Sequence, residues 1–276
     1  MGDRPRIGYM VPQFPGQTHA FFWREVRAME AMGAEVRLLS TRPPPPGIVV
    51  HAWSGEAAAR TAYLASRSPL DALRALPALP WRELAGAEHG LRRDLALALP
   101  AAARLRALAA REGVRHVHVH SCGRAALVAA LAERLGGPSY SLTLHNPLMV
   151  HGPGQNFKWR GARFATVVNA KLLAEVRTVL REDLPARVVV QPMGVDTARF
   201  ARAAPYAPWA PGTGPLRLVT CARLNPVKGL PDLFEAMTML PGLGIDARLL
   251  ILGEDDDGGT GYRRVLEAKV AELGLG

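Results

Sequence analysis

Short apolar runs alternate with stretches of helical periodicity along most of the 276-residue chain. Apolar runs of this length, separated by helix-like segments, are typical of parallel sheets covered by helices. The pattern therefore predicts an α/β fold. The expected strands of the first region are 6–11, 35–40, 115–120, 139–144, 164–168 and 187–191, and its expected helices are 18–32, 124–135 and 170–180.

The segment 53–111 interrupts this alternation. It is rich in Ala, Leu and Arg and contains Pro69, Pro77, Pro80 and Pro100. Because proline lacks a backbone N–H and clashes with the preceding helical turn, each proline is expected to end a helix. The segment is therefore predicted to be an insert of several short helices with little strand content.

A proline- and glycine-rich stretch divides the chain into two predicted domains. The stretch 196–214 has the composition of a linker, and it separates a first domain at 1–195 from a second α/β region at 215–276. With only two strand–helix units, the strands lack neighbouring strands and the sheet lacks helices that cover both of its faces. We therefore expect the second domain to be incomplete and the natural protein to continue beyond Gly276. The expected elements of this region are strands 216–221 and 247–252 and helices 230–240 and 262–273.

The net charge of +10 comes from basic residues that are scattered and almost all Arg. A nucleic-acid-binding protein usually clusters its basic residues, so we expect no nucleic-acid partner. The positive net charge is also compatible with attraction to phosphorylated substrates or to an anionic membrane surface.

The chain also lacks the sequence features of secretion and of membrane insertion. Its amino terminus has no signal-peptide apolar region, and no segment approaches the roughly 18 uninterrupted apolar residues of a membrane span. Cys122 and Cys221 show no metal-ligand spacing and are expected to be buried thiols in a reducing compartment. We expect a cytoplasmic protein, at most peripheral at the inner face of the plasma membrane.

Ligands of open parallel sheets bind at the carboxyl ends of the strands, and several candidate residues occupy such positions. After the first strand, Gly16, Gln17 and Thr18 lead into a helix whose amino terminus could face a ligand, although an ordinary turn is an equal alternative. His145 follows strand 139–144, where it could bond to a substrate hydroxyl or serve only a structural role.

Three histidines alternate along strand 115–120, which places His116, His118 and His120 on one face of the sheet. Their spacing of about 7 Å along a strand is too wide for all three to bind one ion without a bend, so we expect no metal site. His120 lies at the end of the strand and is expected to face a cleft.

The loop 221–229 brings together a guanidinium, an ammonium and the start of a helix. Arg223 offers a fork to phosphate oxygens, Lys228 a point charge, and the helix dipole favours an anion. This combination suits a diphosphate. A solvated basic loop is the alternative, but Lys is scarce in this chain, which favours a function for Lys228.

The next strand is followed by Gly253, Glu254 and three aspartates. The aspartates lack the spacing of an EF-hand, so a solvated acidic turn is expected instead of a Ca²⁺ or Mg²⁺ site.

Several of these motifs together resemble glycosyltransferase family 4, the large retaining group with the GT-B fold. Arg223-Leu-Asn-Pro-Val-Lys228-Gly229 resembles the Arg-x4-Lys-Gly signature of that family, and Thr143-Leu-His145 resembles its Thr-x-His segment. The stretch 193–200 resembles the segment Asn-Gly-Val-Asp-x3-Phe, with Met193 in place of Asn. The stretches 9–25 and 117–120 resemble the branch that builds exopolysaccharides of the colanic-acid type, although Thr18-His-Ala-Phe21 departs from its Ser-Glu-Thr-Phe.

The resemblance implies two Rossmann-like domains facing a cleft, with the second one incomplete. It implies a metal-independent hexosyltransferase without a cofactor, which moves a hexose from a nucleoside-diphosphate sugar to a polysaccharide or lipid-linked acceptor with retention. A GT-B-fold sugar-nucleotide epimerase and an inactive sugar-nucleotide-binding fragment remain alternatives, and residues 1–276 alone are expected to be inactive. In the family, His145 would contact the donor sugar, Arg223 and Lys228 would hold the diphosphate, and Gly16, Gln17, Thr18, His120, Gly253 and Glu254 would line the cleft.

Overall fold

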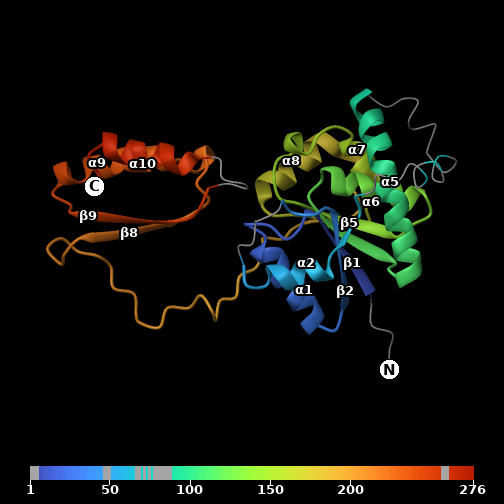
Figure 1. Cartoon of the computed structure of the whole chain (residues 1–276), viewed down its shortest axis with the longest axis horizontal. Helices are drawn as coiled ribbons and strands as arrows, with labels where there is room; N and C mark the ends of the chain where they lie inside the picture. The colour runs from blue at the N-terminus through green and yellow to red at the C-terminus, as the bar shows by residue number, and fades with distance from the viewer. Residues whose placement is uncertain are drawn as a thin grey trace. The chain divides into compact units, whose positions relative to one another are not determined.

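The computed structural model describes residues 6–45, 51–65, 70, 73, 76, 89–255 and 261–276. The chain divides into two compact units, of which the first extends to Val195 and the second runs from Asp196 to Gly276. The first unit holds a seven-stranded sheet and the second a two-stranded sheet (Figure 1).

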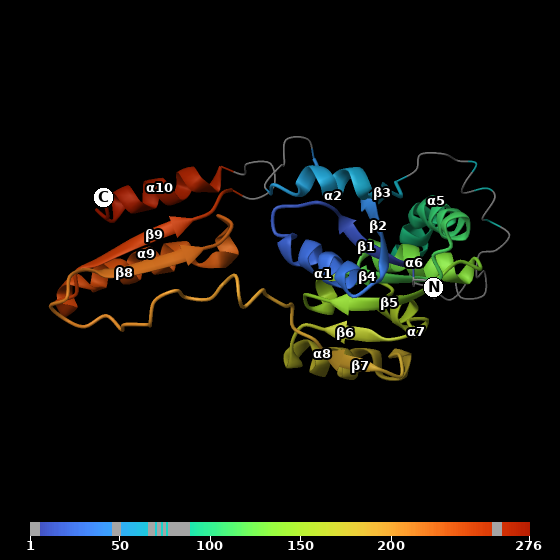
Figure 2. The same ribbon diagram turned by 90° about the horizontal axis from the view of Figure 1, so that it is seen from below.

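All seven strands of the first sheet are parallel, in the order β3-β2-β1-β4-β5-β6-β7 (Figure 2). The chain builds outward from β1 to β3 and then crosses back to place β4 on the other side of β1. The strand order therefore reverses between β1 and β4, which is where open α/β sheets bind ligands. The strands are β1 Arg6–Gln13, β2 Glu35–Arg42, β3 Ala62–Tyr63, β4 His116–His120, β5 Ser139–Leu144, β6 Ala165–Val167 and β7 Val188–Val190.

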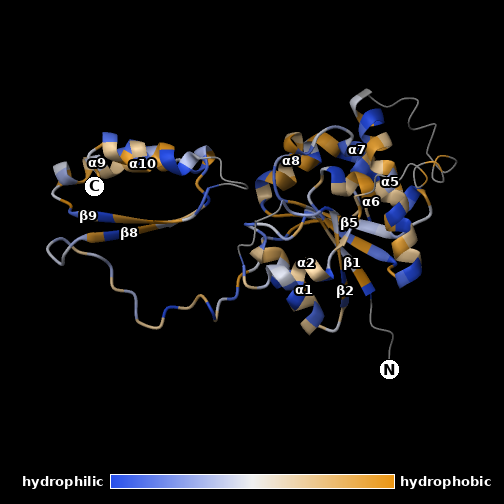
Figure 3. Cartoon of the chain, in the orientation of Figure 1, coloured by the Kyte–Doolittle hydropathy of each residue, from blue (hydrophilic) through white to orange (hydrophobic). Residues whose placement is uncertain are grey.

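Each face of this sheet has its own apolar cluster because successive strand residues point to opposite sides. Along β1, Tyr9 and Val11 pack with residues of α1 and α2, whereas Met10 packs with residues of α5 and α6. Hydrophobic and hydrophilic residues alternate along the flanking helices (Figure 3). The helices are α1 Ala20–Ala31, α2 Ser54–Arg60, α5 His89–Glu112, α6 Arg124–Arg134, α7 Gln155–Arg160 and α8 Ala170–Leu180, with 3-10 turns at Leu148–His151 and Arg181–Asp183.

The insert differs from its prediction in two ways. Helix α5 runs through Pro100 without a break, so the expectation of a helix end there was wrong. The helix buries Leu95, Leu99 and Leu105, and at about 1.5–3 kcal/mol for each buried side chain this outweighs the roughly 3 kcal/mol that an internal proline costs. Strand β3 was also not expected. Pro69, Pro77 and Pro80 lie outside the described residues.

In the second unit, two helices cover one face of a parallel pair of strands. The apolar core beneath them contains Leu230, Phe234 and Leu266. The opposite face of the strands exposes Val219 and Leu250, and Cys221 is exposed rather than buried as expected. This unit comprises β8 Leu216–Cys221, α9 Leu230–Met239, β9 Ala247–Leu252 and α10 Tyr262–Glu272, with 3-10 turns at Pro226–Lys228 and Pro241–Leu243.

Candidate functional site

The carboxyl ends of β4 and β5 and the facing side of α1 bring two histidines and a carboxylate together. His120 Nδ1 lies 3.0 Å from His145 Nε2, and His120 Nε2 lies 3.3 Å from Glu25 Oε2. The Tyr9 hydroxyl donates a hydrogen bond of 2.6 Å to the same Glu25 oxygen. A continuous polar chain therefore runs from Tyr9 through Glu25 and His120 to His145.

The side chains of this polar chain are buried to different extents. The side chain of His120 is completely buried, so it does not face a cleft as the sequence predicted. His145 and Glu25 are half-buried, and Phe22 packs against both imidazole rings, with ring centroids 4.7 and 5.5 Å away. His145 is therefore the histidine of the pair that a ligand can reach.

The same burial keeps both histidines uncharged. It lowers the pKa of His145 to about 4, with a smaller contribution from His151, and it lowers the pKa of His120 well below its usual range. Burial raises the pKa of Glu25, and the hydrogen bond from Tyr9 lowers it in part. At neutral pH, the two rings are therefore neutral imidazoles, each with one N–H and one acceptor nitrogen.

The other histidines of β4 extend this polar surface along one face of the sheet, as their alternation predicted. His116 and His118 each contact Ser141 Oγ, at 2.8 and 2.7 Å, and the second ring nitrogen of His118 lies 2.8 Å from Thr143 Oγ1. Burial lowers the pKa of His118 to about 4. Both nitrogens of His118 thus have hydroxyl partners.

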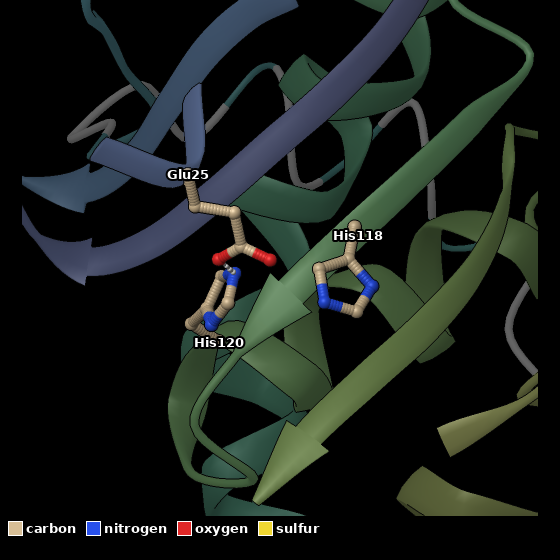
Figure 4. A group of neighbouring side chains, drawn as sticks. All are labelled: Glu25, His118 and His120. Carbon is tan, nitrogen blue, oxygen red and sulfur yellow. Dashed lines mark ion pairs between the residues drawn. The ribbon is translucent and has the colours of Figure 1, made fainter. Parts of the chain in front are cut away.

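The predicted spacing of about 7 Å refers to positions along the strand, and the rings of two β4 histidines approach each other more closely than that. The ring centroids of His118 and His120 lie 4.8 Å apart because the two rings lean toward each other. One ligand atom from each of His118, His120 and Glu25 lies within 4.8 Å of the others, and Figure 4 shows the Glu25 carboxylate between the two rings. The cluster has the residue types of a metal site, with Glu25 in place of the more distant His116.

The loop after β1 approaches this cluster through His19. The backbone N–H of His19 bonds to Gly16 O at 3.0 Å, and the His19 ring packs edge-on against Phe22. A Cβ atom at position 16 would lie 2.7 Å from the His19 ring, so that ring would have to shift for any larger residue. The carbonyl oxygen of Gln17 is 3.0 Å from His51 Nε2, and Thr18 is exposed.

In the second unit, Arg223 and Lys228 lie in the loop between β8 and α9, half-buried and exposed respectively. The Asn225 side chain accepts a 3.0 Å hydrogen bond from Val227 N and so starts the 3-10 turn that ends at Lys228. Gly229, with φ of 63°, then begins α9. Arg223 and Lys228 therefore precede α9 in the chain, and the amino-terminal end of a helix is where anions are favoured.

The turn after β9 lies beside the Arg223 loop. Leu224 N donates a 2.7 Å hydrogen bond to Glu254 O, so the residues on either side of this contact are neighbours in space. Asp255 accepts hydrogen bonds from Gly261 N and Arg263 N at 2.9 and 2.7 Å, which caps the start of α10. This aspartate has a structural role, and residues 256–260 lie outside the described range.

We expect Gly253→Ala to destabilise the second unit by about 1–3 kcal/mol, the cost of overpacking. A Cβ atom at this position would lie 1.9 Å from Ala222 O, so the backbone of one loop must move. Hydrogen exchange of the β8 and β9 amides measures the effect. Gly242→Ala is the matched control because its Cβ would meet no atom within 4 Å. Equal exchange rates in the two variants would contradict this account.

Sequence reasoning did not identify Glu25. The residue reads as an ordinary polar position of an amphipathic helix, and only the packing of α1 against β1 and β4 reveals its partners. The signal available in the sequence was its place three residues after Phe22, which puts both side chains on one helix face. Lys158 was also missed as a buried cation: its Nζ donates to His151 O at 3.0 Å, and burial lowers its pKa to about 8.

Comparisons with known proteins agree with this architecture. Residues 19–199 match the family model described as Glycosyltransferase Family 4. Trehalose 6-phosphate synthase from Burkholderia multivorans superposes with a TM-score of 0.61 at 15% identity, covering 98% of this chain and 70% of the other. Sucrose-phosphate synthase from Thermosynechococcus elongatus gives a TM-score of 0.59 at 18% identity, covering 99% of this chain and 69% of the other.

A third solved structure, the lipopolysaccharide outer core galactosyltransferase WaaB, gives a TM-score of 0.59 at 13% identity, covering 98% of this chain and 65% of the other. No curated protein matches the chain. At these identities the likeness concerns the fold, and it confirms the predicted α/β fold of the GT-B type. The chain spans about two thirds of the length of these structures, between 65% and 70%.

Proposed function

Because the chain belongs to glycosyltransferase family 4, we propose that it transfers a hexose from a nucleoside-diphosphate sugar to a polysaccharide or lipid-linked acceptor. Transfer would proceed with retention and without a metal ion or a cofactor. The observation that carries the proposal is His145, a half-buried neutral imidazole at the carboxyl edge of the first sheet, beside the point where the strand order reverses.

A neutral imidazole suits glycosyl transfer at this position. Positive charge develops on the sugar ring as the bond to the diphosphate breaks. A protonated histidine would oppose that charge, whereas His145, whose pKa burial lowers to about 4, can accept a hydrogen bond from a sugar hydroxyl without adding charge. His145 would thus orient the donor sugar.

The diphosphate leaving group would be stabilised by the second unit. Arg223 supplies a planar fork for two phosphate oxygens, and Lys228 supplies a compact charge. Both lie at the amino-terminal end of α9, whose dipole adds to their field. These cations would neutralise the charge that a metal ion neutralises in other transferases. The loop with Gly16, Gln17 and Thr18 would lie on the acceptor side, and Gly253 and Glu254 would lie by the donor.

We also propose that the protein acts at the cytoplasmic face of the membrane. A net charge of +10 favours attraction to anionic lipid headgroups, where a lipid-linked acceptor would be found. Within the part of the chain that the structure describes, no helix is both long enough and apolar enough to cross a bilayer. Contact with the membrane would then be peripheral.

Product analysis tests the proposed function. The natural protein from its complete reading frame is incubated with a panel of nucleoside-diphosphate hexoses and a lipid-linked acceptor, with and without EDTA. We expect one donor to give a glycosylated acceptor with the anomeric configuration of the donor in both conditions. Conversion of a sugar nucleotide without any acceptor would instead identify an epimerase. Absence of both reactions with every donor would favour an inactive binding module.

We expect residues 1–276 by themselves to transfer little sugar and to bind nucleotide weakly. The sheet of the second unit exposes Val219, Leu250 and Leu252 on one face, and an apolar face of this kind is a risk for aggregation and local unfolding. Transfer by this chain at the rate of the complete natural protein would contradict the expectation.

A further inference from the structure

The polar chain behind His145 constrains which ring nitrogen carries its proton. Glu25, when ionised, can only accept hydrogen bonds, and it already accepts one from the Tyr9 hydroxyl. Within the described residues, His120 Nε2 is buried and makes no hydrogen bond of good geometry, and Glu25 Oε2 lies 3.3 Å from it. A lone pair on this nitrogen would face a carboxylate oxygen across low-dielectric surroundings, which is unfavourable. The proton of neutral His120 therefore lies on Nε2.

The proton position on His120 determines that on His145. With Nε2 protonated, His120 Nδ1 bears a lone pair and can only accept a hydrogen bond. Its partner at 3.0 Å is His145 Nε2, which must then be the donor. His145 is left with an unprotonated Nδ1, which is an acceptor.

We propose that Glu25 and His120 are positioning residues that hold His145 in its Nε2–H tautomer, so that His145 Nδ1 accepts a hydrogen bond from a hydroxyl of the bound sugar. The role assigned to the sugar rests on the proposed function, whereas the tautomer is a property of the protein alone. Phe22 packs on both rings and Tyr9 packs on His120 at a centroid distance of 4.6 Å, which restricts rotation of the rings.

The surrounding titratable groups do not change the proton positions assigned to His120 and His145. His118 faces the same carboxylate, but both of its nitrogens already bond to Ser141 and Thr143. His19 and His151 lie near enough to affect the charge of His120 and His145 respectively, and each disfavours the protonated form of its neighbour. All of these interactions keep the two rings neutral.

A metal ion would demand the opposite tautomers. A cation held by Glu25, His118 and His120 would take the lone pair of His120 Nε2 and move its proton to Nδ1. His120 would then donate to His145 Nε2, and His145 would carry its proton on Nδ1. The metal-free polar chain and the metal site are therefore distinguishable by which ring nitrogen of His145 carries the proton.

Nitrogen-15 NMR of histidine-labelled residues 1–276 tests the proposal at about pH 8, where the lowered histidine pKa values keep the rings neutral and the alkaline pH favours the ionised form of Glu25. The signals are assigned from His120→Asn and His145→Asn. We expect the Nε2–H tautomer of His145 in about tenfold excess or more, the scale of one favourable charge–dipole contact of about 1.4 kcal/mol between Glu25 and His120. Glu25→Gln is nearly isosteric, removes the charge and can donate as well as accept, so it should give a mixture of tautomers.

Glu35→Gln is the matched control, since Glu35 is an exposed partner of Arg6 at the start of β2, and it should keep the native tautomer. An Nδ1–H tautomer of His145 in the unsubstituted protein would overturn the proposal, as would an unchanged tautomer in both Glu25→Gln and Glu25→Ala. Addition of Zn²⁺ should leave the spectrum unchanged, and a switch to the Nδ1–H form would establish a metal site instead. None of these readouts depends on catalysis, so a failure of the proposed function would be recognised separately, by the transfer assay.

Discussion

His145→Ala should lower kcat of the complete natural protein by about 100-fold or more, the scale of a lost positioned polar group. The imidazole is half-buried at the carboxyl edge of β5, and its Nε2 bonds to the fully buried His120. Its removal would leave a hydroxyl of the donor sugar without an acceptor and would admit water beside the reacting carbon. The measurement is steady-state transfer with the donor identified in the product assay.

His116→Ala separates this effect from general loss of stability. His116 is also a half-buried histidine of the same sheet, with bonds of 2.8 Å to Ser139 and Ser141, but it lies at the opposite end of β4. We expect this variant to lose thermal stability and to keep kcat within a few-fold of the unsubstituted protein. Near-normal kcat in His145→Ala, or equal losses of kcat in the two variants, would show that His145 has no specific role in the reaction.

The strands could be predicted from the sequence because their apolar runs reflect burial on both faces of a parallel sheet. The expected run 139–144 is β5 residue for residue, and the expected run 216–221 is β8, although β8 is covered on one face only. Strand β3 escaped prediction because Ala62 and Tyr63 form too short a run to show a pattern. The prediction of a helix end at Pro100 was wrong because the packing of α5 on α6 offsets the free-energy cost of a proline inside a helix.

The candidate site was less accessible to sequence reasoning than the fold. His145 could be proposed because the carboxyl end of a parallel strand is a general ligand position. Glu25, which contacts His120, could not be proposed because this contact depends on how α1 packs against the sheet, and the two residues are 95 positions apart in the sequence. The close approach of the His118 and His120 rings could not be predicted for a related reason: backbone spacing does not determine how far two flexible side chains lean toward each other.

Arg223→Ala and Lys228→Ala should each weaken nucleoside-diphosphate binding by about 1.5–3 kcal/mol, the range for charge-assisted hydrogen bonds. Such losses correspond to about 10- to 150-fold in Kd. Both side chains lie in the loop before α9, and the contact of Leu224 with Glu254 fixes that loop against the next turn. Isothermal calorimetry of the complete natural protein with UDP, GDP and ADP measures the change.

The same titrations distinguish a diphosphate site from a general effect of positive charge. Arg217→Ala removes one charge from an exposed position within β8, on the strand instead of the loop, and should leave Kd nearly unchanged. Arg223→Lys should recover only part of the lost affinity, because an ammonium cannot form two parallel bonds to phosphate oxygens. Unchanged affinity for all three diphosphates in both alanine variants, or an equal loss in Arg217→Ala, would show that Arg223 and Lys228 form a solvated basic loop and that the diphosphate binds elsewhere.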